Sequence, residues 1–265
     1  MGLLDIYDRA RGSLDLLAGS WVRAKPLLAL LDGEPRGSSE LTDLIGAKGK
    51  TVSHSLSDLV SGNLIRRSGT KYSLTNIGRI EATMLADQLA TLSELENHAD
   101  FWNGHSLSSI PPSLQARIGQ LAGGKLYQGT PESPLESQAA FIGAMHGAKK
   151  AWGVSPIMAH GYTDMVFALL DSGADVRLIL AEGVIAKITP AELNRAKSYD
   201  NLQIYAAAEA PRIGFTVTDK LVSIALFGQD GRYDPTQDLI AEGGGAVQWG
   251  EELFDYYLEK IITNN

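Results

Sequence analysis

The segment GKTVSHSLSDLV, residues 49–60, places several small hydrogen-bonding side chains on the first turns of a predicted helix. Lysine, hydroxyl and imidazole groups donate to phosphate oxygens, and hydroxyl groups also bond to the edges of bases. Short side chains let a helix backbone approach a DNA groove closely. The residues that this pattern marks as candidate DNA contacts are Lys48, Lys50, Thr51, Ser53, His54 and Ser55.

A cluster of basic residues surrounds this segment. Residues 47–80 hold six basic residues and one acidic residue, Asp58, although the whole chain has a net charge of −8. A local excess of positive charge in an acidic protein favours a surface that faces phosphate. Arg66, Arg67 and Lys71 are expected on a hairpin beside the helix, where they would contact the DNA backbone. On charge alone, a chance cluster on a solvated surface explains the pattern equally well.

Other kinds of chemistry find little support in the sequence. The 265 residues include no cysteine, which excludes disulfides, thiolate metal sites and cysteine nucleophiles. The five histidines are scattered, and neither a His-Glu-x-x-His motif nor a Gly-x-Ser-x-Gly elbow occurs. Gly243–Gly245 lacks the Lys-Ser/Thr of a phosphate loop and no strand is predicted to lead into it, so a loop or helix cap is preferred. We expect no metal, no cofactor and no enzymatic activity.

The elements that position the basic helix follow from the hydrophobic pattern. Val52, Leu56 and Leu59 are expected to face inward, and the order helix, helix, turn, helix, hairpin, helix is that of a winged helix-turn-helix. Residues 50–61 then occupy the position of the recognition helix. Helices are predicted at residues 21–31, 38–45 (capped by Ser38) and 50–61 (ended by Gly62-Asn63), a hairpin at 64–74, and a long helix from Thr75 to Glu96.

Beyond residue 96 the pattern changes to alternating helices and strands. This alternation implies an α/β domain with a mostly parallel sheet covered by helices. Helices are predicted at residues 134–151, 162–172, 190–197 and 249–262, and strands at 152–158, 175–180, 202–206, 214–218 and 221–227.

A ligand site in such a domain is expected outside the carboxyl ends of the strands. That position selects Ser155, His160 and Tyr162 after the first strand and Glu182 after the second. His160 and Tyr162 are also compatible with an ordinary surface loop. Trp102, His105 and Arg117 fit a role in holding a domain junction better than a role in relaying a signal.

Ordered motifs run along most of the chain. They are YSLTNIGRI (72–80), FWNGHSLSSIPPSLQARIGQL (101–121), GVSPI (153–157), GADVRLIL (173–180), FTVTDKLVSIALFGQDGRYD (215–234) and AVQWGEELFDYYL (246–258). Together they resemble archaeal winged-helix regulators whose C-terminal half is a methanogenesis-regulatory, filament-regulator type domain. The resemblance starts near Trp21 and implies an archaeal transcriptional regulator, a dimer, with a sensor domain. It brings no ligand residues that can be transferred.

The second half also resembles, more faintly, the phospholipase D-like effector domains of archaeal sugar-responsive regulators. The shared feature is a helix, a VSPI-like strand, a helix and a VRLI-like strand. Such phosphodiesterases need a histidine with a lysine two residues on, so if the fold is shared the chemistry is absent. The residues two positions after the five histidines are Leu56, Asp100, Leu107, Ala148 and Tyr162.

The sequence therefore predicts a winged helix-turn-helix DNA-binding domain in residues 1–96 and an α/β regulatory domain in residues 97–265. The expected function is transcription regulation by a homodimer that binds double-stranded promoter DNA and senses a small molecule or a partner. The alternative is a winged-helix adaptor that binds protein and lacks specific DNA binding. The acidic first residues and the lack of any run near eighteen apolar residues predict a cytoplasmic protein without membrane contact.

Overall fold

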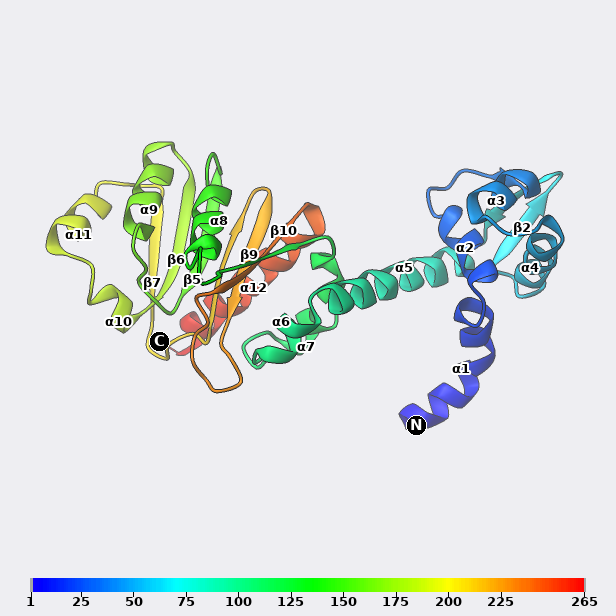
Figure 1. Ribbon diagram of the computed structural model, residues 1–265, viewed down its shortest axis with the longest axis horizontal. Coiled ribbons are helices and arrows are strands. Elements are labelled where there is room, and N and C mark those ends of the chain that lie inside the picture. The colour runs from blue at the N-terminus through cyan, green and yellow to red at the C-terminus, as the bar shows by residue number, and fades with distance from the viewer. Residues whose placement is uncertain (1, 265) are drawn as a thin grey trace. The chain divides into compact units, whose positions relative to one another are not determined.

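The computed structural model describes residues 2–264 (Figure 1). Contacts divide the chain into two compact units, Met1–Leu89 and Ala90–Asn265. The division falls inside the long helix α5, Asn76–Asn97. Within the described residues, no helix combines the length and the apolar character needed to cross a membrane.

The first unit contains helices and a small antiparallel sheet with the strand order β1-β3-β2. From Trp21 onward the predicted order of helix, helix, turn, helix, hairpin and helix is confirmed, with a short extra strand, β1, in the turn; the helix α1 before it was not predicted. The elements before α5 are α1 (Leu3–Ala18), α2 (Trp21–Ala29), β1 (Arg36–Gly37), α3 (Ser38–Ile45), α4 (Gly49–Ser61), β2 (Ile65–Ser68) and β3 (Lys71–Leu74).

Local signals end one helix and start the next. Asn63, directly after the last turn of α4, takes a left-handed conformation with φ of 58°. The Thr75 hydroxyl accepts a hydrogen bond from the Gly78 backbone N–H at 2.9 Å and so caps α5, as predicted. Gly78 itself permits a close approach, because a Cβ there would lie 1.8 Å from the Leu64 carbonyl oxygen. The prediction of Ser38 as a cap is wrong, since Gly37 holds that position and Ser38 is the first helical residue.

The helix α4 is anchored by apolar side chains, as the sequence indicates. Val52, Leu56 and Leu59 are completely buried and pack with Leu27 and Leu41 in the core of the first unit. Burial of these three side chains fixes which face of α4 is turned to solvent, and this makes the helix a rigid platform for its polar residues.

Truncation of Leu56 to alanine should destabilise the first unit by about 2–5 kcal/mol, because it removes buried methyl groups and leaves a cavity. Hydrogen exchange of the amides in residues 38–74 measures this change. Ser53→Ala on the exposed face of the same helix is the control and should change stability by less than about 0.5 kcal/mol. Equal exchange rates in both variants would show that α4 is not packed as described.

The second unit is built on one seven-stranded sheet with the order β4-β10-β9-β8-β5-β6-β7. The prediction of a mostly parallel sheet is wrong: only β5, β6 and β7 pair in parallel, and the other pairings are antiparallel. The β8–β9 hairpin and two unpredicted strands account for the difference. The strands are β4 (Lys125–Gln128), β5 (Lys150–Ser155), β6 (Asp175–Ala181), β7 (Leu202–Ala207), β8 (Ile213–Thr218), β9 (Leu221–Leu226) and β10 (Gln237–Glu242).

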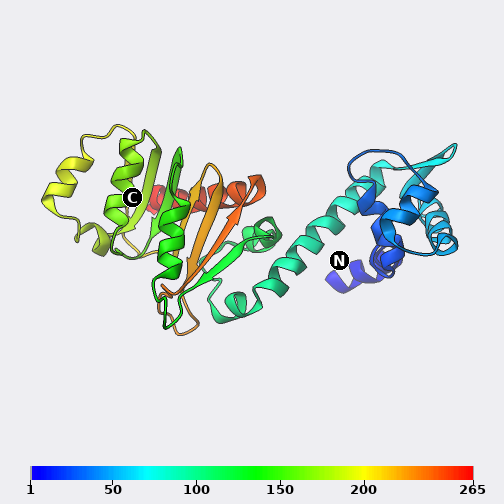
Figure 2. The same ribbon diagram turned by 45° about the horizontal axis from the view of Figure 1, so that its top comes forward.

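Helices cover both faces of this sheet (Figure 2). The long helix α12 buries Trp249, Leu253 and Phe254 against one face, together with Phe215 and Val217 of β8. Helices α8 and α9 cover the other face, where Phe141 and Phe167 are buried. The helices of this unit that follow α5 are α6 (Ala99–Gly104), α7 (Pro112–Gln115), the 3-10 helix η1 (Ile118–Leu121), α8 (Glu136–Ala144), α9 (Tyr162–Asp171), α10 (Glu182–Ile185), α11 (Pro190–Ala196) and α12 (Gly244–Asn264).

Candidate nucleic-acid interface and ligand cavity

The first turns of α4 present most of the predicted DNA contacts to solvent. The exposed members are Lys48, Lys50, Thr51, Ser53 and His54. Ser55 was expected on the same face, but that expectation is wrong, because its side chain is only 6% exposed. Ser55 stands three residues after Val52 and next to Leu56, so the helical period turns it toward the core.

The hairpin of β2 and β3 carries Arg66, Arg67 and Lys71, and all three side chains are exposed. The Arg66 Nε donates to the Ser73 hydroxyl at 3.1 Å. The Arg67 Nε donates to the Gly69 carbonyl oxygen at 2.9 Å, and the guanidinium lies 5.8 Å from the centre of the Tyr72 ring. These contacts hold the arginines along the hairpin while their charges stay accessible.

The positive charges of this surface are not neutralised internally. Among the ion pairs found within residues 2–264, none includes Lys48, Lys50 or a basic residue of the hairpin. Asp58, the one acidic residue of the cluster, is paired instead with Arg23, with 3.7 Å between Nη1 and Oδ2. The exposed face of α4 and the hairpin therefore present unpaired cations beside hydroxyl groups, an arrangement suited to phosphates and base edges.

The second unit contains a cavity of about 130 Å³ over the α8/α9 face of its sheet. Of the four predicted ligand residues, Ser155 and Tyr162 line this cavity, whereas His160 and Glu182 do not. Both are exposed, and Glu182 is the first residue of α10. The cavity lies over the carboxyl-terminal halves of the parallel strands β5 and β6, where Ser155, Met158 and Leu180 line it, and it extends over β8 and β9 of the mixed sheet.

Small residues on the central strands create the space. Gly153, Thr216 and Ser223 are successive register partners across β5, β8 and β9, so they share one face of the sheet. A Cβ on Gly153 would lie 2.9 Å from the Thr216 hydroxyl oxygen. A Cβ on Gly214 would lie 2.8 Å from the Tyr233 hydroxyl oxygen. Glycine at these two strand positions therefore makes room for hydroxyl groups above the sheet.

A buried carboxyl group, that of Asp238, lies at the cavity wall. Asp238 on β10 is 7% exposed, and both of its oxygens accept from the Ser223 hydroxyl, at 2.8 and 2.9 Å. Burial raises the pKa of Asp238 to about 7, although hydrogen bonds from the Ser223 hydroxyl and the Ile224 backbone act in the opposite direction. Burial and the Asp238 charge also raise the pKa of Tyr162 to about 12. The sequence did not indicate Asp238, Ser223 or Tyr233 as site residues: Asp238 lies on β10, which was not predicted, and the other two face the cavity only through the pairing of the assembled sheet.

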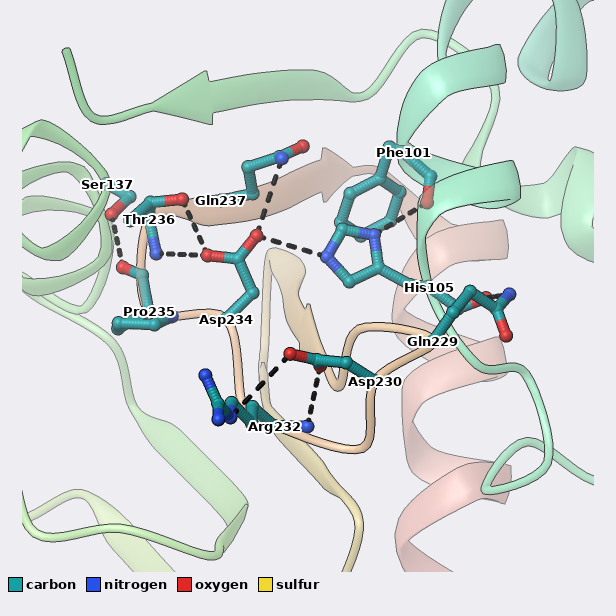
Figure 3. Close-up of polar contacts among 10 residues, drawn as sticks. All are labelled: Phe101, His105, Ser137, Gln229, Asp230, Arg232, Asp234, Pro235, Thr236 and Gln237. Carbon is teal, nitrogen blue, oxygen red and sulfur yellow. Dashed lines mark hydrogen bonds and ion pairs between the residues drawn. The ribbon is translucent and has the colours of Figure 1, made fainter.

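A polar network at the end of α6 joins this helix to the connection between β9 and β10 (Figure 3). His105 is buried; its Nδ1 lies 2.7 Å from the Phe101 carbonyl oxygen, and its Nε2 lies 3.2 Å from Oδ2 of Asp234. Both ring nitrogens of His105 therefore have a hydrogen-bonding partner inside the network. The Gln229 amide adds a bond to the His105 carbonyl oxygen at 2.8 Å.

The electrostatics of Asp234 agree with this pairing. Burial alone raises its pKa, but hydrogen bonds from Thr236 and from His105 outweigh burial and lower the pKa below the usual value. The network therefore holds a carboxylate against a buried histidine. Tyr233, which precedes Asp234 in the sequence, lines the cavity. The connection between β9 and β10 therefore contributes both to the cavity and to the His105 network.

Trp102 and Arg117 do not join His105 in one cluster. The Trp102 indole donates to Oε1 of Glu94 at 3.3 Å, whereas the Arg117 Nη1 donates to Oε1 of Glu252 on α12 at 3.0 Å. The first contact joins α6 to α5, and the second joins the segment between α7 and η1 to α12, both within the second unit. All of these contacts lie inside the second unit, so the expected role of the three residues at a domain junction stays a prediction.

The segment Gly243–Gly245 is a helix start. Gly243 takes φ of 98°, and α12 begins at Gly244, so the interpretation as a cap is confirmed. The statement that no strand leads into this segment is wrong, because β10 ends at Glu242. Elsewhere in residues 2–264, no group of three or more His, Cys, Asp or Glu side chains is arranged to hold a metal ion.

Two family models match the chain. Residues 11–93 match the N-terminal domain of the methanogenesis regulatory protein FilR1, and residues 134–260 match its middle domain. A relative, the methanogenesis regulatory protein FilR1 of Methanothrix harundinacea (strain 6Ac), is 29% identical over 229 residues, which is 84% of this chain and 51% of the relative. The chain thus spans about half the length of the curated relative that it matches.

Two solved structures show more distant likeness. TrmBL2, an archaeal chromatin protein for which a novel mode of DNA binding is described, has a TM-score of 0.44 at 14% identity, over 96% of this chain and 99% of that chain. NucT from Helicobacter pylori has a TM-score of 0.36 at 13% identity, over 53% of this chain and 95% of that chain.

Proposed function

The chain belongs to the FilR1 family of archaeal methanogenesis regulatory proteins, and we propose that it is a transcriptional regulator that binds promoter DNA as a homodimer and responds to a small molecule. The observation that carries the proposal is the surface of unpaired cations and hydroxyl groups on α4 and the hairpin. In this proposal α4 enters the major groove, and Arg66, Arg67 and Lys71 bind the flanking phosphates.

A binding selection from a pool of random duplexes tests this function. The proposal predicts enrichment of one sequence with two related half-sites, because a two-fold dimer reads its site twice. The competing adaptor hypothesis predicts binding without sequence preference and affinities near the nonspecific range, with Kd of about 10⁻⁴–10⁻⁶ M. A selection that returns no enriched motif would favour the adaptor.

The helix α5 is the proposed contact between the two copies. Along α5, six large apolar side chains are exposed to solvent, with exposed fractions from 39% to 62%. Apolar patches of this kind are typical of association surfaces. The side chains are Ile77, Ile80, Met84, Leu89, Leu92 and Leu95.

Ile80→Glu should raise the dimer dissociation constant at least about tenfold, because a charge would be buried in the contact. Ile80 is 62% exposed within one chain, so the substitution should leave each copy folded. Sedimentation velocity measures the change, and Ile80→Leu is the conservative control. A wild-type protein that stays monomeric at high micromolar concentration would argue against α5 as the contact.

The cavity of the second unit is the proposed effector site. Its lining includes Tyr233, and the next residue, Asp234, is bonded to His105 at the end of α6. A ligand that moves Tyr233 would therefore act on α6, which directly follows α5 along the chain. A phospholipase D-like fold without catalytic residues stays a prediction for this unit.

A further inference from the structure

The charged side chains that line the cavity are all acidic. Of the residues that line it within the described chain, the carboxyl groups are those of Asp238 and Glu192, and none of the lining residues is basic. A phosphate, carboxylate or nucleotide in this site would find no basic side chain to pair with and would be repelled by the two carboxylates. The lining therefore disfavours anions as a class.

The two acids differ in how deeply they are buried, since Asp238 is buried and Glu192 is half-buried. The Glu192 carboxylate accepts from the Thr189 backbone N–H at 2.8 Å and from its hydroxyl at 2.7 Å, which completes a capping box at the start of α11. Asp238 is nearly fully buried among mostly apolar side chains; it is hydrogen-bonded by the Ser223 hydroxyl and the Ile224 backbone, but no ion pair of its carboxylate is found within residues 2–264. A buried carboxylate is stabilised when a cation pairs with it, so Asp238 is the group that gains most from a cationic ligand.

Two phenol groups face the same space. Tyr162 on α9 and Tyr233 on the β9–β10 connection both line the cavity, and no hydrogen bond of either hydroxyl is found within residues 2–264. Aromatic rings attract cations through their faces, and phenol oxygens accept hydrogen bonds from ammonium groups. The remaining walls are apolar side chains such as Met165, Val166 and Leu193.

The size of the cavity limits the ligand. A volume of about 130 Å³ is close to that of engineered protein cavities of about 150 Å³, which hold benzene. A ligand that fills this space has an apolar body of roughly one six-membered ring. Larger ligands would extend through the opening.

From this lining we infer that the cavity binds a small organic cation whose ammonium group pairs with Asp238 and whose apolar body packs between the sheet and α9. The inference deepens the proposed function, since this cation would be the effector. It concerns binding to the second unit alone and needs no DNA for its test.

Binding should release a proton. At neutral pH part of Asp238 is protonated, because burial raises its pKa to about 7, and an ammonium ligand requires the carboxylate. The titratable groups facing Asp238 from α9, the β9–β10 connection and β4 are the phenols of Tyr162, Tyr233 and Tyr127. On β4 Lys125 lies over the Tyr127 ring, and on α8 the charged residue, Glu136, is exposed. Affinity for the cation should therefore rise about tenfold from about pH 6 to about pH 8.

Three probes of one shape test the inference: benzylammonium, benzyl alcohol and benzoate. Calorimetric titration of the full chain should give an affinity for benzylammonium at least about tenfold above that for benzyl alcohol, and no binding of benzoate. Asp238→Asn should abolish this preference and leave benzyl alcohol unchanged. Glu192→Gln, the other lining acid, should behave as the wild type.

Absence of benzylammonium binding at millimolar concentration, equal affinities for benzylammonium and benzyl alcohol, or unchanged binding in Asp238→Asn would overturn the inference. If the variant does not fold, the pH dependence of the wild type decides, and a flat profile counts against it. Operator binding by the same preparation is measured separately. Failure of the ligand test with intact DNA binding rejects the cation, whereas loss of DNA binding with intact cation binding rejects the proposed function.

Discussion

Replacement of Arg66, Arg67 and Lys71 together by alanine should weaken binding to the selected operator by on the order of a hundredfold at low salt. The three exposed side chains form no ion pair within residues 2–264, so their charges are available to phosphates. Each phosphate contact contributes about 0.9 to the slope of log affinity against log salt, so the slope should fall by roughly 3. Fluorescence anisotropy at several salt concentrations measures both quantities.

A matched variant removes the same charge elsewhere. Lys149→Ala, Lys187→Ala and Lys197→Ala delete three exposed lysines of the second unit. This control should keep the affinity of the wild type within about threefold and keep its salt slope, because net charge alone has a small effect at a distance. If both triple variants lose affinity equally, the hairpin does not contact the DNA and only the total charge matters.

Replacement of Asp238 by asparagine should stabilise the second unit at pH 8 and change little at pH 4. The folded state raises the pKa of Asp238 to about 7, above about 3.9 in an unfolded chain, so the folded state binds more protons between these values. The contribution of Asp238 to stability is therefore fully present below about pH 4 and is lost as the pH rises through 7. Between these pH values the free energy of unfolding falls by about 4 kcal/mol because of this group. Asparagine keeps the shape and removes the charge.

Urea denaturation at the two pH values measures this effect. In a Trp21→Phe background the remaining tryptophans, Trp102, Trp152 and Trp249, all report on the second unit. The exposed Asp200 serves as the control, since Asp200→Asn makes the same chemical change outside the core. A pH profile of Asp238→Asn that runs parallel to the wild-type profile would show that Asp238 does not carry this dependence.

The first unit beyond α1, which was not predicted, was predictable because its signals are local. Apolar spacing identified α4 and its buried residues, and the hairpin followed from a short turn with alternating residues. Ser55 is the exception on α4. Its polar side chain suggested solvent, but the helical period places it beside Leu56 in the core.

The cavity was less predictable because it depends on pairing between distant strands. The strands β4 and β10 are short and mix charged and apolar residues. They pair antiparallel although about 110 residues separate them in the sequence. Without β10, Asp238 had no assigned place, and the sheet appeared mostly parallel. Ser155 and Tyr162 were found since they follow a strand that was recognised, whereas the glycines that open the space gain meaning only in the assembled sheet.

The central claim is that α4 reads DNA sequence. The most direct measurement is the ratio of affinities for the selected operator and a scrambled duplex, by fluorescence anisotropy at one fixed salt concentration. We predict a ratio of at least about 10³ for the wild type. In Thr51→Ala/His54→Ala the ratio should fall at least about tenfold while affinity for the scrambled duplex is unchanged. A wild-type ratio near one, or a ratio that the α4 variant leaves unchanged, would contradict the claim.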